Sequence, residues 1–243
     1  MFDSNIAIIL LGTKYPGNIG SAARAMFNMG LGQLILAAPK CSINEESYRL
    51  AKSGKSILDN AKTCRTLKSA LRGIRFLVGT TSKTGGYRSQ TYPPRSLVPR
   101  ILDYAAHQKA GILFGPEDTG LVDQDLAPCQ FLMRISTQRN ANSINLAQSV
   151  MIVCYELFLG TLDREPGHVP KLASIEQIEA MYAQLEKALL EIGFLHSENT
   201  KHMMMRIRRM LGKAGLEKSD VGVLRGIARQ INWYATAKRK QIP

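Results

Sequence analysis

Three short segments of the chain combine glycine turns with polar side chains of the kinds that act in catalysis. The first is GTKYPGNIGSAAR, residues 12–24, which lies between an apolar run and a segment of helical periodicity. A glycine-rich turn at that place brings backbone N–H groups and the positive end of a helix near a bound ligand. Asn18 and Arg24 are spaced to reach the mouth of this turn, although a turn asparagine and a surface arginine are an alternative interpretation.

A dinucleotide-binding fold also has a glycine-rich turn after its first strand, but two features disfavour it here. The G-x-G-x-x-G spacing is absent. The second expected strand ends in Ala37-Ala38-Pro39 rather than in the acid that would hold a ribose.

Two later segments carry acids, amides and hydroxyl groups. The sequence GPEDTG, residues 115–120, follows an apolar run directly, and α/β sheets bind ligands at the carboxyl ends of their strands. Glu117 is its candidate acid, although Gly-Pro turns with flanking acids are also common surface loops. Ser143 and Asn145 open a strongly periodic helix, where they could be helix caps or part of a site.

The apolar pattern places these segments at the ends of strands in an α/β domain. Short apolar runs alternate with helix-period segments through the first two thirds of the chain, which is typical of a mostly parallel sheet. The expected strands are 6–11, 33–37, 74–80, 111–114 and 131–135. The expected helices are 20–29, 45–52, 67–71, 96–108 and 143–159.

A change in composition sets off the last third of the chain. Two prolines and a glycine within 163–170 predict a linker over residues 164–173, and strand signals stop there. Ser174 is the expected N-cap of a long amphipathic helix, which is followed by helices near 201–213 and 219–234. We therefore predict an α/β domain over residues 1–163 and a small all-helical extension over residues 174–243.

This extension is strongly basic. The chain has a net charge of +13, and residues 201–243 hold eleven Lys and Arg against two acids, which predicts an anionic partner. The candidate phosphate contacts in the extension are Arg206, Arg208, Arg209, Lys213, Arg225, Arg229 and the run 238–240. Lys83 and Arg88 lie in a loop that mixes cations with tyrosines, as single-stranded RNA binders do, or that is a plain surface loop.

Other features limit the cellular setting and the cofactors. The four cysteines lie far apart, with no C-x-x-C pair and no histidine cluster, so we expect no metal site and reduced thiols in a cytoplasmic protein. No uncharged apolar run is long enough for a membrane span, and the first residues do not form a signal peptide. We expect a soluble protein without a membrane partner.

Taken together, the three segments resemble the three motifs of the SPOUT superfamily, in particular of SpoU-type RNA ribose 2′-O-methyltransferases. They read PGNIGSAARAMFNMG, ILFGPEDTGL and NSINLAQSV, in the order of the family. The resemblance extends over the whole chain, because VGTTSK at 78–83 also matches and the basic tail is similar to that of TrmJ-type enzymes. TrmJ-type enzymes methylate the 2′-hydroxyl of nucleotide 32 in the tRNA anticodon loop.

The resemblance implies a homodimer with helices on both faces of the sheet and a C-terminal trefoil knot in the α/β domain. It implies that S-adenosylmethionine binds in the knotted loops, with no metal. The catalytic residues that it implies are Arg24, Asn18, Glu117, Ser143 and Asn145. The cofactor contacts that it implies are Thr80, Gly115, Ile135, Ser143 and Leu146. The GPEDTG segment departs from the basic GRERxG form of some TrmJ relatives, which puts the expected tRNA contacts in question but not Glu117.

The expected function is therefore S-adenosylmethionine-dependent 2′-O-methylation of tRNA at nucleotide 32. A ribosomal RNA 2′-O-methyltransferase of the same family is one alternative. An RNA-binding protein that kept the fold without catalysis is another, and the joint presence of Asn18, Arg24, Glu117 and Asn145 argues against it. A different α/β nucleotide-binding enzyme is disfavoured by the missing phosphate-loop spacing.

Overall fold

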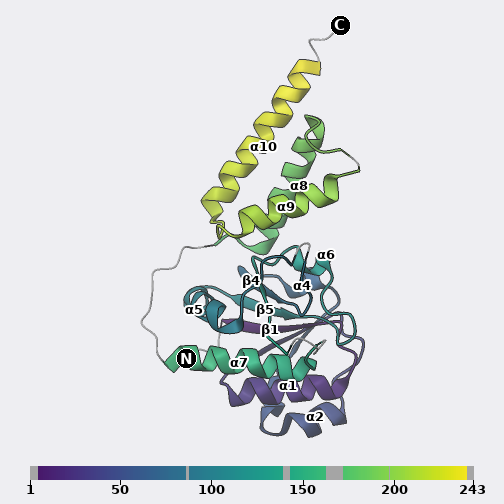
Figure 1. Ribbon diagram of the computed structural model, residues 1–243, viewed down its shortest axis with the longest axis vertical. Coiled ribbons are helices and arrows are strands. Elements are labelled where there is room, and N and C mark those ends of the chain that lie inside the picture. Colours follow the sequence, from purple (N-terminus) through teal and green to yellow (C-terminus); the bar gives the residue numbers. More distant parts are fainter. Residues whose placement is uncertain (1–4, 86–87, 139–142, 163–171, 197, 240–243) are drawn as a thin grey trace. The chain divides into compact units, whose positions relative to one another are not determined.

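A computed structural model describes residues 5–85, 88–138, 143–162, 172–196 and 198–239 (Figure 1). The chain divides into two compact units, residues 1–170 and 171–243. Of the predicted linker at 164–173, all but Leu172 and Ala173 lies outside the described residues.

The first unit contains one parallel sheet. Among the described residues it has six strands in the order β3-β2-β1-β5-β4-β6, and every pairing is parallel. The strands are β1 Ile6–Leu11, β2 Gln33–Ala37, β3 Lys62–Cys64, β4 Phe76–Thr80, β5 Ala110–Phe114 and β6 Phe131–Met133. All residues of the central strands β1 and β5 are buried, because helices cover both faces of the sheet.

Helices of the first unit lie on both sides of this sheet, as predicted. In Figure 1, α1, α2 and α7 lie below the strands, and α4 and α6 lie above them. The helices are α1 Pro16–Asn28, α2 Glu45–Ala51, α3 Lys55–Asp59, α4 Leu67–Ala70, α5 Pro94–Ala105, α6 Asp123–Leu126 and α7 Leu146–Leu162. Helix α1 begins four residues before the predicted start because Pro16 occupies its first turn, where a proline ring is favourable.

Close packing fixes the start of α1 against α2. A Cβ atom on Gly20 of α1 would lie 2.1 Å from the backbone oxygen of Ser47 in α2, so only glycine fits there. The hydroxyl of Ser47 donates a hydrogen bond of 2.9 Å to the backbone oxygen of Pro16. These contacts set the position of the first turn of α1, which carries Asn18.

Helix α7 is apolar over most of its circumference. Val150, Val153 and Leu157 are buried, as the predicted periodicity requires. Tyr155 and Phe158 are exposed, on a helix with few polar side chains. A helix that is apolar on nearly all sides is normally covered by protein on nearly all sides. The exposed part of α7 is therefore a candidate contact surface.

The second unit consists of three helices in its described residues. They are α8 Ile175–Glu191, α9 Thr200–Gly212 and α10 Lys218–Arg239. Ser174 caps α8 as predicted, because its side chain accepts from the backbone N–H of Gln177 at 3.3 Å. The core of the unit contains Met181, Tyr182, Leu195, Met204 and Val221.

No helix in the described ranges has both the length and the apolar composition that crossing a membrane requires. The trefoil knot implied by the resemblance stays a prediction.

Candidate active site

The sheet topology brings the three motif segments to one edge. The first follows β1 and the second follows β5, and these two strands are neighbours in the sheet. The third precedes α7, which packs against α1 and α5. Because parallel strands end at the same edge of a sheet, loops that are a hundred residues apart in sequence meet there.

A chain of hydrogen bonds joins all three segments. The side-chain amide of Asn18 donates to Oε1 of Glu117 at 2.8 Å. The side-chain amide of Asn145 donates to Oδ1 of Asn18 at 3.2 Å. The second carboxylate oxygen of Glu117 accepts from the backbone N–H of Lys14 at 3.1 Å. The three predicted residues Asn18, Glu117 and Asn145 are thus held in fixed orientations relative to one another.

Asn145 also caps helix α7. Its Oδ1 accepts from the backbone N–H groups of Ala147 at 2.9 Å and of Gln148 at 3.4 Å. The sequence allowed two interpretations of Asn145, as a helix cap or as part of a polar site. Its hydrogen bonds are compatible with both. The cap explains why α7 begins at Leu146, three residues later than predicted.

Arg24 stands outside this hydrogen-bonded chain. It is exposed on α1, six residues after Asn18, which is about 9 Å along the helix axis and roughly a third of a turn away around it. Asn18 thus joins the hydrogen-bonded chain, whereas Arg24 is exposed farther along the helix, and the catalytic roles of both stay predictions.

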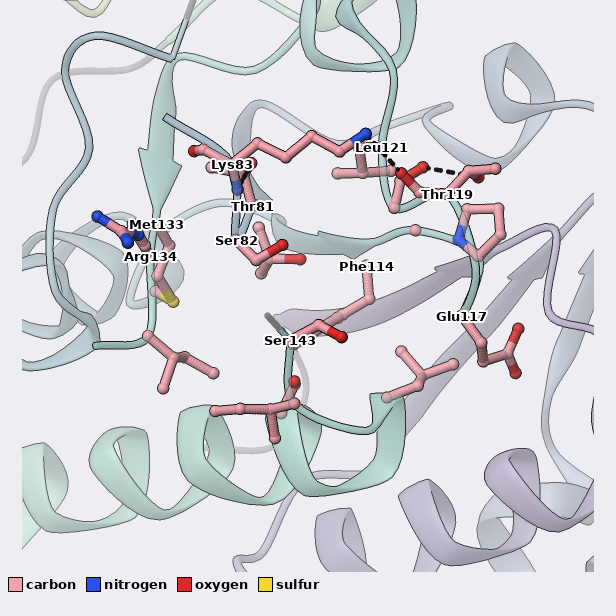
Figure 2. A pocket seen from close by; sticks show the side chains of 18 of the residues that line it. Thr81, Ser82, Lys83, Phe114, Glu117, Thr119, Leu121, Met133, Arg134 and Ser143 are labelled. Atoms are coloured by element: carbon pink, nitrogen blue, oxygen red, sulfur yellow. Dashed lines mark hydrogen bonds between the residues drawn. The ribbon is translucent and has the colours of Figure 1, made fainter. Parts of the chain in front are cut away.

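Beside the hydrogen-bonded residues lies a cavity of about 330 Å³ (Figure 2). Its walls come from residues 80–83, 114–121, 133–135, 137, 143, 144, 146 and 149. The lining includes all five predicted cofactor contacts, which are Thr80, Gly115, Ile135, Ser143 and Leu146. Its volume falls within the range of roughly 300–1,000 Å³ that is usual for small-molecule sites.

The loop after β5 forms a tight wall of the cavity. A Cβ atom on Gly115 would lie 2.3 Å from the backbone nitrogen of Leu121, so the loop folds back on itself at a position that only glycine can occupy. Thr80 contacts the same strand end, because its hydroxyl donates to the backbone oxygen of Leu113 at 2.9 Å. The lining combines apolar side chains, including Leu121, Ile135 and Leu146, with hydroxyl groups and loop backbone. This mixture suits a ligand with an apolar ring system and a polar, charged end.

Two cations predicted to bind RNA contact this loop. The ammonium group of Lys83 donates to the backbone oxygen of Thr119 at 3.0 Å, as Figure 2 shows. Arg88 donates to the backbone oxygen of Leu121 at 2.9 Å and forms an ion pair with Asp123. The Arg88 side chain is only 11% exposed, so its charge is turned toward the protein.

A further ion pair connects the loops after β1 and β5. Lys14 and Asp118 lie 2.7 Å apart at the surface. The hydrogen bond from Lys14 lowers the pKa of Asp118, and the same contact raises the pKa of Lys14. The prediction from sequence did not include Lys14 or Asp123. The available signal was that Lys14 lies within the first candidate segment and that Asp123 follows the second by three residues.

The basic residues of the helical unit have two different environments. The four predicted RNA contacts Arg206, Arg209, Arg225 and Arg229 are exposed. Arg208, which the sequence placed among them, is only 16% exposed and pairs with Glu179, with Nη2 and Oε2 2.8 Å apart. Its guanidinium also stacks 4.3 Å from the ring centre of Tyr182. Arg208 therefore stabilises the helical unit rather than presenting its charge to solvent. The side chains of 238–240 lie outside the described residues.

Within the described residues, no three His, Cys, Asp or Glu side chains gather as the ligands of a metal ion would.

Comparisons with known proteins agree with this arrangement. Residues 5–155 match the SpoU rRNA methylase family, and residues 176–242 match the C-terminal domain of the tRNA methyltransferase TrmJ. A protein of Pseudomonas aeruginosa named tRNA (cytidine/uridine/adenosine-2'-O-)-methyltransferase TrmJ is 34% identical over 235 residues, which cover 91% of each chain. A protein of Pectobacterium atrosepticum named tRNA (cytidine/uridine-2'-O-)-methyltransferase TrmJ is 32% identical and covers 93% of this chain and 96% of its own.

Solved structures show the same relationship. The crystal structure of TrmJ from Z. mobilis ZM4 matches with a TM-score of 0.80 at 27% identity, covering 94% of this chain and all of the other. The SpoU methyltransferase AviRb from Streptomyces viridochromogenes, at 20% identity and a TM-score of 0.54, shares the fold. The chain therefore belongs to the SpoU methylase family and, within it, to the TrmJ-type proteins.

Proposed function

We propose that this protein transfers a methyl group from S-adenosylmethionine to a ribose 2′-hydroxyl of tRNA, at nucleotide 32 of the anticodon loop. The observation that carries the proposal is the hydrogen-bonded chain of Asn145, Asn18 and Glu117 beside a cavity lined by all five predicted cofactor contacts. The names of the TrmJ relatives support tRNA as the substrate and cytidine or uridine, with adenosine also in one relative, as the modified nucleoside.

The residues of the cavity fit S-adenosylmethionine. Leu121, Ile135 and Leu146 would contact its apolar parts, and Thr80 and Ser143 offer hydroxyl groups to its polar ones. When bound, this cofactor supplies an electrophilic methyl group together with its leaving group. The tight loop at Gly115 would keep water from that side of the reacting atoms.

The protein contributes mainly by fixing positions. Holding two reacting atoms about 3 to 3.5 Å apart in the correct orientation contributes roughly 7 to 11 kcal/mol in well-oriented systems. Glu117 is held by two donors of the first segment, and Asn18 is bonded to the second and third segments, so both present fixed polar groups to an incoming ribose. Ser143 lies in the lining of the same cavity and would contact the substrate or the cofactor.

Arg24 acts in this proposal as a fixed cation. A guanidinium with a pKa above about 12 seldom releases its proton, so it serves poorly as a base. It can stabilise the negative charge that develops on the 2′-oxygen, and it can hold an adjacent phosphate by two parallel hydrogen bonds. The Arg24 side chain is exposed on α1 in the single chain.

A homodimer would cover that surface. Phe27 of α1 is exposed, as are Tyr155, Phe158 and Leu162 of α7. The two helices pack on each other, and each of them exposes apolar side chains. Exposed apolar regions mark contact surfaces when they are large. We therefore propose that α1 and α7 form the dimer interface and that the protein works in the cytoplasm, where tRNA is available.

Methyl transfer tests the proposal directly. The protein is incubated with labelled S-adenosylmethionine and with tRNA from a strain that lacks its gene, and digested tRNA is analysed by mass spectrometry. The expected product is a 2′-O-methylated nucleotide at position 32. Label that enters only ribosomal RNA would support the alternative substrate, and absence of transfer to any RNA would support a non-catalytic RNA-binding protein.

The role of Arg24 is tested by Arg24→Lys. Lysine keeps the charge but loses the planar two-pronged donor, so turnover should fall by at least tenfold without a shift of the pH profile. Near wild-type turnover with the same pH profile would remove support for the two-pronged cation.

A further inference from the structure

Helix α10 has two faces of different character. Ala228 is buried against Leu185 and Ala188 of α8, and Ile231 packs beside them. The opposite face is exposed and carries Trp233, which is 67% exposed. Because burying a large aromatic ring is favourable, a tryptophan left in solvent on the outer face of a packed helix calls for a functional explanation.

The exposed tryptophan lies beside cations. Arg225, Arg229 and Trp233 follow one another at intervals of four residues, so their side chains are neighbours along one side of the helix. Arg225 is held in place, because its Nε donates to the side-chain oxygen of Gln184 on α8 at 3.0 Å. Asp220 is the single acid in the described residues of this helix.

We propose that this face of α10 is a stacking platform for an unpaired base of the tRNA, with Trp233 under the base and Arg225 and Arg229 on the adjoining phosphates. The inference rests on the proposed function and adds a base-binding element to it. An indole ring stacks on any base, and cations one or two helical turns away match the spacing of a base and its backbone. The platform would contribute affinity that phosphate contacts alone do not give.

A second copy of this chain is the alternative occupant. Val223 and Ile227 are also exposed on α10, and an apolar surface of that kind can serve as a subunit contact. A symmetric contact centred on Trp233, which lies on the same side of α10 as Arg225 and Arg229, would bring the arginines of the two copies near one another, which is repulsive. Polyanionic RNA meets the same charges favourably, so the charge of this face favours RNA.

The fluorescence of the full-length protein tests the platform. Trp233 is the sole tryptophan of the 243 residues, so the tryptophan signal reports on this position alone. A short single-stranded oligoribonucleotide should quench it by stacking, and an abasic oligonucleotide with the same number of phosphates should not. Equal quenching by both would overturn the proposal, because charge alone would then explain the signal.

Substitutions then connect the ring to tRNA binding. Trp233→Ala should weaken binding of unmodified tRNA at least fivefold, and Trp233→Phe, which keeps a stacking ring, should stay within about twofold of wild type. Phe194→Ala is the matched control, because Phe194 is a 53% exposed ring of the same unit and should not affect binding. Arg229→Ala should lower the salt dependence of binding, and Trp233→Ala should not.

The outcomes separate this inference from the proposed function. If the wild-type protein methylates tRNA but Trp233→Ala behaves like Phe194→Ala, the platform is wrong and the function stands. If Trp233→Ala changes the oligomeric state in sedimentation without changing tRNA affinity, the face is a subunit contact. If the wild-type protein neither binds nor methylates tRNA, both proposals fail.

Discussion

The two units of this chain present their polar side chains in different ways. In the α/β unit, Asn18, Glu117 and Asn145 come from distant parts of the sequence and are held by hydrogen bonds to one another. In the helical unit, the exposed arginines lie along the surfaces of single helices. Chemistry at a reacting atom requires fixed positions, whereas binding of a polyanion requires charge within a tolerant range of distances.

Cations show the same difference. Lys83 and Arg88 of the α/β unit hold the backbone of the loop that lines the cavity. Arg206 and Arg209 of the helical unit are exposed on α9. A basic residue in the first unit is therefore not by itself a sign of an RNA contact.

The largest effect on methyl transfer is expected when Asn145 loses its side-chain amide. Asn145→Asp keeps the oxygen that caps α7 but loses the donor to Asn18, so single-turnover methyl transfer should fall roughly 100-fold. Stability in urea should change by only a few tenths of a kcal/mol, whereas Asn145→Ala should lose about 1 kcal/mol as well. Gln148→Ala, an exposed position of α7, is the control. Wild-type turnover in Asn145→Asp would mean that the hydrogen-bonded chain has no part in catalysis.

The next prediction concerns which of the two units binds which ligand. The double substitution Arg206→Glu and Arg209→Glu should weaken tRNA binding by more than tenfold. The slope of the logarithm of the binding constant against the logarithm of the salt concentration should fall by the equivalent of up to about two phosphate contacts. Affinity for S-adenosylmethionine, measured by calorimetry, should stay unchanged. Lys187→Glu, an exposed site on α8 close to Glu186 and Glu191, changes the net charge by half as much and shows how far net charge alone weakens binding. Equal losses of tRNA affinity and of S-adenosylmethionine affinity would contradict the proposal that the two units bind different ligands.

A smaller effect should come from Arg88. Arg88→Ala removes the donor to the backbone oxygen of Leu121 and leaves Asp123 without its partner, so the dissociation constant of the cofactor should rise about tenfold. Binding of tRNA should change less. Lys83→Ala, at an exposed position, should give a change of about twofold. A loss of tRNA affinity with unchanged cofactor affinity would instead support the RNA-binding role predicted from sequence.

The smallest effect concerns the thiols, all four of which lie in the α/β unit. Burial raises the pKa of the Cys154 thiol to about 12, and burial also raises that of Cys129. The thiolate is the reactive form and a raised pKa keeps it scarce, so iodoacetamide at pH 8 should leave both residues unlabelled in the folded protein. Labelling along a urea titration then follows unfolding of the α/β unit alone. Fast labelling of Cys154 in the native protein would show that α7 opens locally.

Strands and long helices could be predicted from the sequence because their apolar pattern is regular. β1 and β2 have the predicted bounds, and the helical unit has the three predicted helices. β3 was missed because Lys62 and Thr63 of this short edge strand are exposed and form no apolar run. Of the short helices, α4 was predicted and α3 and α6 were missed, because four or five residues give little sign of a period.

The site could be predicted only in part. The motif residues were found because their types and order are specific, but their hydrogen-bond partners depend on which loops meet in space. The environments of Arg88 and Arg208 illustrate this limit, since charge in a sequence carries no sign of the acid that will lie opposite. Asp123 and Glu179 are 35 and 29 residues away from their partners.

The contact between Gly20 and the backbone of Ser47 has a consequence for how this enzyme family can diversify. Because not even a methyl group fits there, any larger residue must push α1 away from α2, and Asn18 moves with it. A displacement of about 1 Å at reacting groups can cost about 100-fold in rate. Gly20 thus takes no chemical part in the reaction, yet it limits which substitutions the family can accept near the site.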